Sequence, residues 1–212
     1  ETSPFTTSSV GTAGFSSLSG LDFQPGTGTL YASSGFGDGG NLYTLNPTSG
    51  AAALVGATGF AAVSAIVFDP GTGILYGSSG LATDAGNALI IIDPNTGAGT
   101  FVGAYGSSGG NVIEVLDGIA IDPTSGILYG ASSFAFDGTP GDIFSIDKLT
   151  GAATLLGSLT GVTQTVAGLA FDGAGNLYAS LGSGDGSILS IDLSSFTHTI
   201  FGDATASRSA SD

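Results

Sequence analysis

The feature that most constrains the fold is a sequence pattern that occurs four times along the chain. Each copy begins with an apolar run that ends in a turn and continues with a Leu-Tyr pair. It closes with a second turn and an apolar residue followed by Gly. The tyrosines of the four pairs are Tyr31, Tyr76, Tyr129 and Tyr178, which are 45, 53 and 49 residues apart. Short strands repeated with such a period are typical of β-propeller blades.

Each copy has room for four short strands, rich in β-branched and aromatic residues and bounded by Gly, Pro, Asp and Asn. In the second copy the expected strands cover roughly 63–69, 73–79, 88–93 and 99–104, which we call A to D from the axis outward. The sequence therefore predicts an all-β fold, a single four-bladed β-propeller of four-stranded antiparallel blades with a surplus N-terminal strand. The predicted divisions are an N-terminal D-like strand and lead-in at 1–17, blades at 18–62, 63–115, 116–165 and 166–203, and a C-terminal tail at 204–212.

The Leu-Tyr pairs predict how the blades pack. Adjacent residues of a strand point to opposite faces, so the two members of a pair cannot contact the same neighbouring blade. We expect the four leucines to be buried between blades and the tyrosines to be partly exposed or hydrogen-bonded near blade edges. The leucines are Leu30, Leu75, Leu128 and Leu177.

Two turns in each copy share one chemistry. Most begin with Asp or Asn, many continue with Pro, and most end with Gly, as in Asp69–Gly73 and Asp93–Gly97. This order suits a type I turn that is closed by a residue with positive φ and whose leading carboxylate accepts a backbone N–H. The fourth copy is more divergent, at Asp172–Asn176 and Asp192–Phe196. The turn aspartates are therefore predicted to be structural.

An apolar strand ending in Asp-Pro, a Leu-Tyr strand, an Ile-Asp-x-x-Thr-Gly turn and a final Val-Gly strand together resemble the NHL/YVTN class of bacterial propeller repeats. The similarity covers residues 18–202. It implies a propeller fold without selecting an activity, because that class includes binding modules, surface-layer proteins, some lactonases and quinoproteins. Members usually have six or seven blades, so a chain with four departs from the class.

The charge of the chain excludes several kinds of partner. Seventeen acidic residues stand against Lys148 and Arg208, which gives a formal net charge of -15. Such a chain repels nucleic acids and anionic membranes, and no apolar run is long enough to span a bilayer. There is no Cys or Met, and the numbering begins at Glu1. We expect an extracellular or cell-surface protein from which a signal peptide has been removed.

No residue pattern points to catalysis. His198 is the only histidine, and it lies in the last strand between Thr197 and Thr199, without the orienting acid and oxyanion site that a catalytic triad requires. The expected A strands carry small and apolar residues instead of the polar cluster that propeller hydrolases need at the channel. The sequence predicts a protein that is not an enzyme.

Calcium is the one metal that the sequence makes a candidate. Single acids lie in Gly-rich B–C loops, and Glu114 and Asp117 lie in a long D–A loop on the same predicted face. Calcium needs several oxygen ligands at once, and none of these loops has the spacing of a dedicated calcium loop. The alternative is a set of solvated Asp-Gly turns, and no other cofactor is predicted. The candidate ligands are Asp38, Asp84, Asp137, Asp142 and Asp185.

One segment is surplus to four complete blades. Thr6, Thr7, Ser8, Ser9, Val10 and Gly11 look like a fifth D strand, 45 residues before the strand that contains Val55 and Gly56. A surplus strand can add to the sheet of a neighbouring subunit. We therefore expect a structural subunit of an extracellular filament or surface layer, whose partners are copies of itself. The alternative is that the strand closes its own ring as a clasp, which leaves a secreted propeller that binds a glycan or a protein, with calcium as a conceivable aid.

Overall fold

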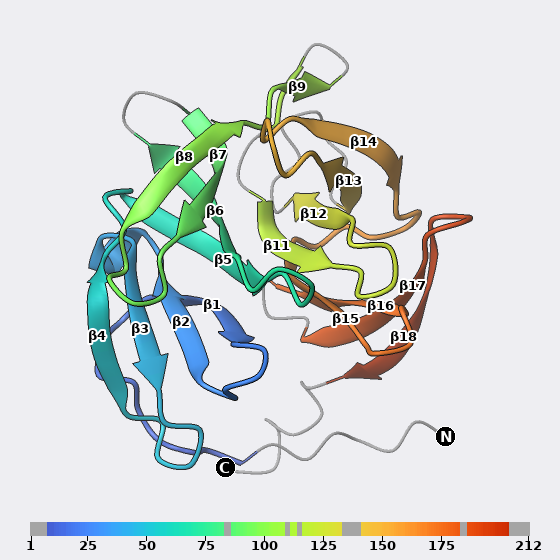
Figure 1. Ribbon diagram of the computed structural model, residues 1–212. Helices are drawn as coiled ribbons and strands as arrows, with labels where there is room; N and C mark the ends of the chain where they lie inside the picture. The colour runs from blue at the N-terminus through green and yellow to red at the C-terminus, as the bar shows by residue number, and fades with distance from the viewer. Residues whose placement is uncertain are drawn as a thin grey trace.

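The computed structural model describes residues 8–82, 86–108, 111–113, 116–132, 141–182 and 186–203. Four sheets of four antiparallel strands follow one another in chain order and are arranged around a common axis (Figure 1). This confirms the prediction of an all-β, four-bladed propeller. Within the described ranges the only helix is the short 3-10 turn η1 (Phe36–Asp38), and none is long and apolar enough to cross a membrane.

In every blade the strands run A, B, C, D from the axis outward. Blade 1 contains β1 (Leu18–Phe23), β2 (Leu30–Ser34), β3 (Asn41–Leu45) and β4 (Ala52–Ala57). Blade 2 contains β5 (Ala62–Phe68), β6 (Leu75–Ala82), β7 (Gly86–Ile92) and β8 (Gly99–Ala104). Blade 3 contains β11 (Leu116–Ile121), β12 (Leu128–Ser132), β13 (Asp142–Ile146) and β14 (Ala153–Ser158). Blade 4 contains β15 (Val166–Phe171), β16 (Leu177–Leu181), β17 (Ser187–Asp192) and β18 (Thr197–Asp203). A small hairpin, β9 (Ser107–Ser108) and β10 (Asn111–Val112), lies between blades 2 and 3 in the chain.

The blades repeat one another down to the register of their inner strands. The A strand of each blade carries an irregularity near its start, where β5, for example, pairs Val63 with Ser79 and Ala65 with Ser78. The shift lies at the equivalent place in β1, β11 and β15. Because the register repeats, each residue of one blade has an equivalent in the other three, and their surroundings can be compared directly.

The turn chemistry that the sequence predicts is confirmed. In the turn between β7 and β8, Asp93 Oδ1 accepts the N–H of Asn95 at 2.8 Å and Asp93 Oδ2 accepts the hydroxyl of Thr96 at 2.9 Å. These hydrogen bonds lower the pKa of Asp93, so its carboxylate holds the turn across the neutral range. Gly97 closes the turn with a φ of 79°. The turn aspartates are therefore structural where the structure describes them.

The Leu-Tyr strands pack as predicted in three blades of four. The side chains of Leu75, Leu128 and Leu177 are at most 1% exposed, whereas that of Leu30 is only half-buried. The tyrosine turns to the opposite side, toward the next blade, where Tyr31 donates its hydroxyl to the carbonyl of Pro94 at 3.2 Å. Tyr31 is 7% exposed, and its hydrogen bond agrees with the prediction that the tyrosines are partly exposed or hydrogen-bonded near blade edges.

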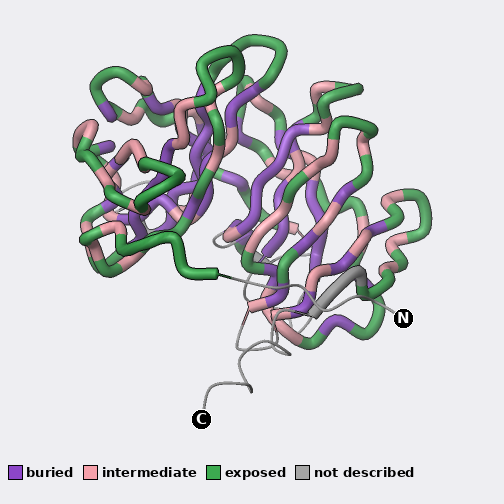
Figure 2. The backbone as a smooth tube through the Cα atoms, turned by 90° about the horizontal axis from the view of Figure 1, so that it is seen from below, coloured by how far each residue is buried: buried purple, intermediate pink, exposed green. Residues whose placement is uncertain are grey.

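Three of the four contacts between blades are closed and one is open. We call the face of a blade that is turned toward the preceding blade its leading face, and the opposite one its trailing face. The A strands β1 and β5, β5 and β11, and β11 and β15 pack on each other, but β15 and β1 make little contact in the described residues. Figure 2 looks toward this open seam, with blade 1 on the left and blade 4 on the right.

Candidate functional site

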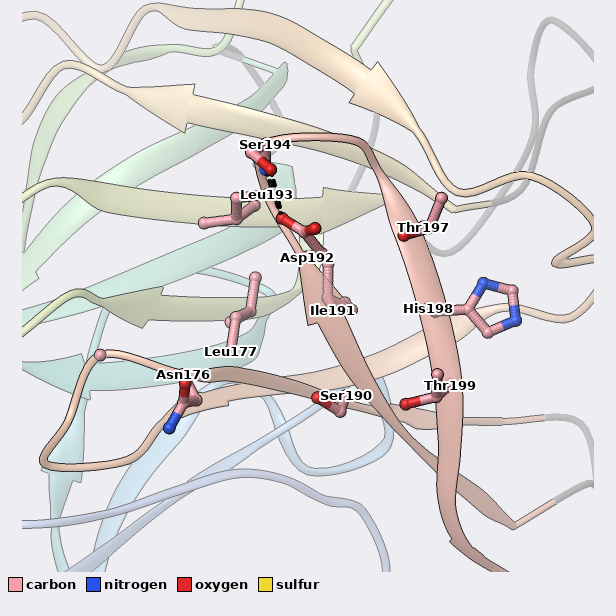
Figure 3. Close-up of a pocket in the computed structure, with 11 residues that line it drawn as sticks. Asn176, Leu177, Ser190, Ile191, Asp192, Leu193, Ser194, Thr197, His198 and Thr199 are labelled. Carbon is pink, nitrogen blue, oxygen red and sulfur yellow. Dashed lines mark hydrogen bonds between the residues drawn. The ribbon is translucent and has the colours of Figure 1, made fainter.

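The polar pocket on blade 4 is the best-defined candidate site (Figure 3). It has a volume of about 400 Å³ and lies where the A–B turn, the C–D turn and strands β17 and β18 come together. Ser190 and Thr199 are cross-strand partners, so their side chains lie on one face of the sheet. The lining residues are Gly175, Asn176, Leu177, Ser190, Ile191, Asp192, Leu193, Ser194, Thr197, His198 and Thr199.

The rim of the polar pocket is held by the divergent C–D turn of blade 4. Asp192 Oδ1 accepts the N–H of Ser194 at 2.8 Å and its hydroxyl at 2.7 Å, while Asp192 Oδ2 accepts the hydroxyl of Ser195 at 3.0 Å. These bonds lower the pKa of the Asp192 carboxyl. The turn ends at Phe196 with a φ of 52°, where the other C–D turns have Gly, and the Phe196 ring packs on Gly157 of blade 3.

The polar pocket has no arrangement for nucleophilic catalysis among its lining residues. His198 pairs with Ile191, one residue along from the Ser190–Thr199 pair, so its ring is on the opposite face of β18. Figure 3 shows the imidazole pointing away from Ser190 and Thr199. His198 therefore cannot act as a base on the hydroxyl of Ser190 or Thr199. The pocket can recognise a ligand by hydrogen bonds and by shape.

A second hollow, the apolar pocket, lies on the trailing face of blade 4. It has a volume of about 450 Å³, and the residues that line it border the open seam. Its lining is almost free of polar atoms, because main chain, methyl groups and one aromatic ring make up most of it. The lining residues are Gly168, Leu169, Ala170, Tyr178, Ala179, Ser180 and Ile188.

The axial cavity is small. It has a volume of about 80 Å³ and is lined by residues of all four A strands, among them Leu21, Ile66, Ile119 and Leu169. Asp117 is the only acid in this lining. A space of this size holds water molecules but no drug-sized or sugar-sized ligand.

The calcium prediction concerns five aspartates, of which the structure describes two. Asp38 holds the segment that leads into β1. Its Oδ2 accepts the N–H of Ser16 at 2.9 Å and that of Ser17 at 2.7 Å. Asp142 is 6% exposed and accepts the hydroxyl of Ser158. Asp84, Asp137 and Asp185 lie outside the described residues, as does Glu114. No group of three or more potential ligands that could hold a metal occurs in the ranges that are described, and calcium binding stays a prediction.

The predicted interface strand lies, where it is described, on blade 1 of its own chain. Thr6 and Thr7 are outside the described residues, and Ser8, Ser9, Val10 and Gly11 form no assigned strand. A Cβ on Gly11 would stand 1.9 Å from the carbonyl oxygen of Ser49, so this backbone is packed directly on the C–D turn of blade 1. Further along, Phe15 stacks on Tyr43 with ring centroids 4.2 Å apart. We call residues 8–17 the N-terminal segment.

Sequence reasoning missed both pockets on blade 4. The signal for the polar pocket was the fourth C–D turn, which lacks the closing Gly that the other three have, at Gly50, Gly97 and Gly151. The apolar pocket has no signal of its own, because Gly168 and Tyr178 occupy the same places in the repeat as residues that are covered in other blades.

No family model matches the sequence, and no curated protein matches it either. Many solved structures share the propeller fold. One is a protein of unknown function from Bacteroides thetaiotaomicron, 17% identical, with a TM-score of 0.61 over 90% of this chain and 45% of the other. An auxiliary nutrient binding protein from the same organism is 17% identical, with a TM-score of 0.60 over 88% of this chain and 42% of the other. Another from Bacteroides ovatus is 11% identical, with a TM-score of 0.58 over 87% and 42%.

The chain thus spans less than half the length of each of these proteins. Identities this low show a common fold and nothing finer. The resemblance to the NHL/YVTN class is confirmed at the level of the propeller fold, and membership of that class stays a prediction.

Proposed function

We propose that this protein is a non-catalytic, extracellular binding propeller that binds a neutral, hydroxyl-rich ligand, a saccharide, in the polar pocket of blade 4. The observation that carries the proposal is the lining of that pocket. Hydroxyls of Ser190, Ser194, Thr197 and Thr199 gather there around a volume of about 400 Å³. Saccharides are recognised by such groups, which both donate and accept hydrogen bonds.

The charge at the polar pocket selects among hydroxyl-rich ligands. Asp192 is ionised at neutral pH, since hydrogen bonds lower its pKa, and no lysine or arginine is among the lining residues. An anionic ligand would be repelled, while a neutral one can donate hydroxyls to the carboxylate. The half-buried Leu193 adds apolar surface against which the C–H groups of a sugar ring can pack.

The comparisons support a binding propeller over the structural subunit that we expected first. Two of the similar structures are named auxiliary nutrient binding proteins. The N-terminal segment, which the filament hypothesis needs as a donor strand, is packed on Ser49 and Tyr43 of its own blade 1. A segment packed in this way is not free to act as a donor strand, which supports the alternative of a binding module. An extracellular location suits this role, because a chain with one lysine and one arginine offers few cleavage sites to trypsin-like proteases.

Titration calorimetry with a panel of neutral oligosaccharides tests the proposal, and the Ser190→Ala/Thr199→Val variant locates the site. We expect at least one saccharide to bind, and the variant to weaken binding about tenfold or more, because it removes two hydrogen-bonding groups. Blade 3 offers a matched control, since Ser145 and Thr154 form the equivalent cross-strand pair. Ser145→Ala/Thr154→Val should bind like the wild type. The proposal is wrong if no saccharide binds, or if both variants weaken binding equally.

A further inference from the structure

The trailing faces of the blades differ in what covers them. A Cβ on Gly20 of blade 1 would stand 2.6 Å from the backbone nitrogen of Ile66, and one on Gly118 of blade 3 would stand 2.8 Å from that of Leu169. The main chain of the next blade therefore lies directly on these glycines. The equivalent residue of blade 4 is Gly168, whose Cβ would meet only the flexible hydroxyl of Ser180, at 2.9 Å. The trailing face of blade 4 has the same shape as the others, but no blade formed by the described residues lies upon it.

The leading face of blade 1 is uncovered in the same way. Leu21 is 50% exposed and Phe23 is 52% exposed, whereas the equivalent Ile66 and Phe68 of blade 2 are 4% and 3% exposed. Large apolar side chains with half of their surface exposed on two adjacent positions are costly for a surface that nothing covers. Both faces of the open seam thus carry the residues of a contact between blades.

The N-terminal segment occupies the place of a preceding blade's D strand. Gly56 of blade 1 packs on the C–D turn of blade 2 at Thr96, and Gly103 of blade 2 packs on that of blade 3 at Thr150. Gly11 makes the same backbone contact with the C–D turn of blade 1, at Ser49. Blade 4 already has its own D strand, β18, paired with β17. The N-terminal segment is therefore placed as the outermost strand of a blade whose A, B and C strands are not among those of blades 1 to 4.

The open seam is narrow at the axis. Leu21 of β1 and Leu169 of β15 line the same cavity of about 80 Å³, although the two strands hardly touch. This cavity is too small to hold a strand, so a blade that enters the seam moves β1 and β15 apart at the axis. A second copy of the chain does not fit it, because each of its blades has at least one face covered by a neighbour, and the seam must contact both faces of its occupant.

We propose that the open seam is the docking site of a fifth blade, a three-stranded β-meander of the same repeat that takes Ser8–Gly11 as its D strand. Its A strand lies on Gly168 and the apolar pocket, and its trailing face covers Leu21 and Phe23. Main-chain hydrogen bonds then complete a strand that has no ladder within blades 1 to 4.

This docking site is separate from the polar pocket. Thr154 and Thr100, the equivalents of Thr199 in blades 3 and 2, remain exposed although another blade follows each of them. A fifth blade therefore leaves Thr199 open as well, and the failure of one proposal leaves the other standing.

The chain itself supplies the probe, because each repeat has the pattern that the seam requires. Residues 1–5 are replaced by a copy of residues 18–50, so that the copied third strand runs into Thr6 as Gly50 runs into Ala51. We expect the unfolding midpoint to rise by about 5 °C or more, since each added interface stabilises a repeat protein. The chain has no Cys. A single thiol introduced by Ala170→Cys on the apolar pocket should then react about tenfold more slowly with a thiol reagent.

Two controls make the result specific. The same extension with its residues in shuffled order should give neither effect. Gly168→Val should leave the unextended protein unchanged, because the only described atom that its Cβ would crowd is the movable hydroxyl of Ser180, yet should abolish both effects of the ordered extension. The proposal is overturned if the ordered extension neither raises the midpoint nor protects the thiol, or if Gly168→Val makes no difference to it. It is also overturned if the unextended protein dimerises and Gly168→Val separates the dimer.

Discussion

The seam between blades 1 and 2 and the seam between blades 4 and 1 present nearly the same residues in different surroundings. Phe68 is 3% exposed and Phe23 is 52% exposed, although both end an A strand at the same place in the repeat. Ser33 is completely buried and donates its hydroxyl to the carbonyl of Val63, whereas the equivalent Ser180 is exposed. The repeat therefore specifies a contact between blades, while the number of consecutive repeats decides whether that contact is made.

The largest difference between closed and open seams should appear at the leucines of the Leu-Tyr strands. Leu128 is fully buried between blades 2 and 3, and Leu128→Ala should lower the free energy of unfolding by about 2–5 kcal/mol. Leu30 faces the open seam and is half-buried, so Leu30→Ala should cost no more than about 1 kcal/mol. Urea unfolding of both variants measures the two costs. Equal losses, or a loss below about 1 kcal/mol at Leu128, would contradict this account of the packing.

Gly118 and Gly168, which are equivalent in the repeat, test how closely the main chain of the next blade approaches at a closed and at an open seam. Gly118→Val forces a side chain against the backbone of Leu169 and should cost about 1–3 kcal/mol by overpacking. Gly168→Val at the open seam should change the free energy of unfolding by no more than about 0.5 kcal/mol. The equivalent residue of blade 2 is Ala65, which is 5% exposed, so the seam between blades 2 and 3 has room for a methyl group. Valine is therefore a sharper test than alanine. A similar loss of unfolding free energy at both glycines would mean that the seam between blades 4 and 1 is closed.

The sequence allowed the fold to be predicted almost completely and the candidate sites hardly at all. Strand order, blade number and the role of turn residues such as Asp93 depend on local chemistry, which is repeated and therefore visible. The exposure of Phe23 depends on a missing neighbour, and the sequence of a repeat does not record its neighbours. The polar pocket forms because Ser190 and Thr199 meet across a sheet at an edge, and only the register brings these two residues together.

Lys148 of blade 3 forms an ion pair with blade 2 across a closed seam, and among the described residues the open seam has no such pair. Its Nζ lies 2.8 Å from Asp69 Oδ2, and the Asp69 side chain is only 6% exposed. Lys148→Met would leave a nearly buried carboxylate without its cation and should cost about 1–2 kcal/mol, reduced from a fully buried pair because the lysine is partly exposed. Leu149→Ser, at the exposed neighbouring residue, is the control and should have no effect.

The pH dependence of this ion pair has a definite sign. Burial opposes ionisation of Asp69, but hydrogen bonds from Lys148, Gly71 and Thr72 outweigh it and lower the pKa of the carboxyl. A folded-state pKa below the unfolded value of about 3.9 stabilises the protein above that pH, and the contribution is lost as the pH falls toward the folded value. The cost of Lys148→Met should therefore shrink in acid. A cost that is independent of pH in urea titrations would contradict the pairing.

The smallest expected effect lies at Asp22, the carboxylate of the seam between blades 1 and 2. Burial raises the pKa of Asp22, even though its Oδ2 accepts the N–H of Phe68 at 2.6 Å and its Oδ1 that of Phe23 at 2.8 Å. The folded protein then holds this proton more tightly than the unfolded chain does. Stability is lost as the pH rises from about 3.9 through the folded-state pKa, which is the opposite of the behaviour of Asp69.

Asp22→Asn keeps an acceptor oxygen for Phe68 and removes the charge, so it should abolish this loss. We expect the variant and the wild type to be about equally stable near pH 3, and the variant to gain up to about 1 kcal/mol relative to the wild type near pH 6. Urea unfolding at the two pH values measures the difference. Parallel curves would show that Asp22 is solvated like a surface carboxylate. That result would weaken the contrast between the closed and open seams, because a tight contact between blades 1 and 2 is what distinguishes the surroundings of Gly20 from those of Gly168.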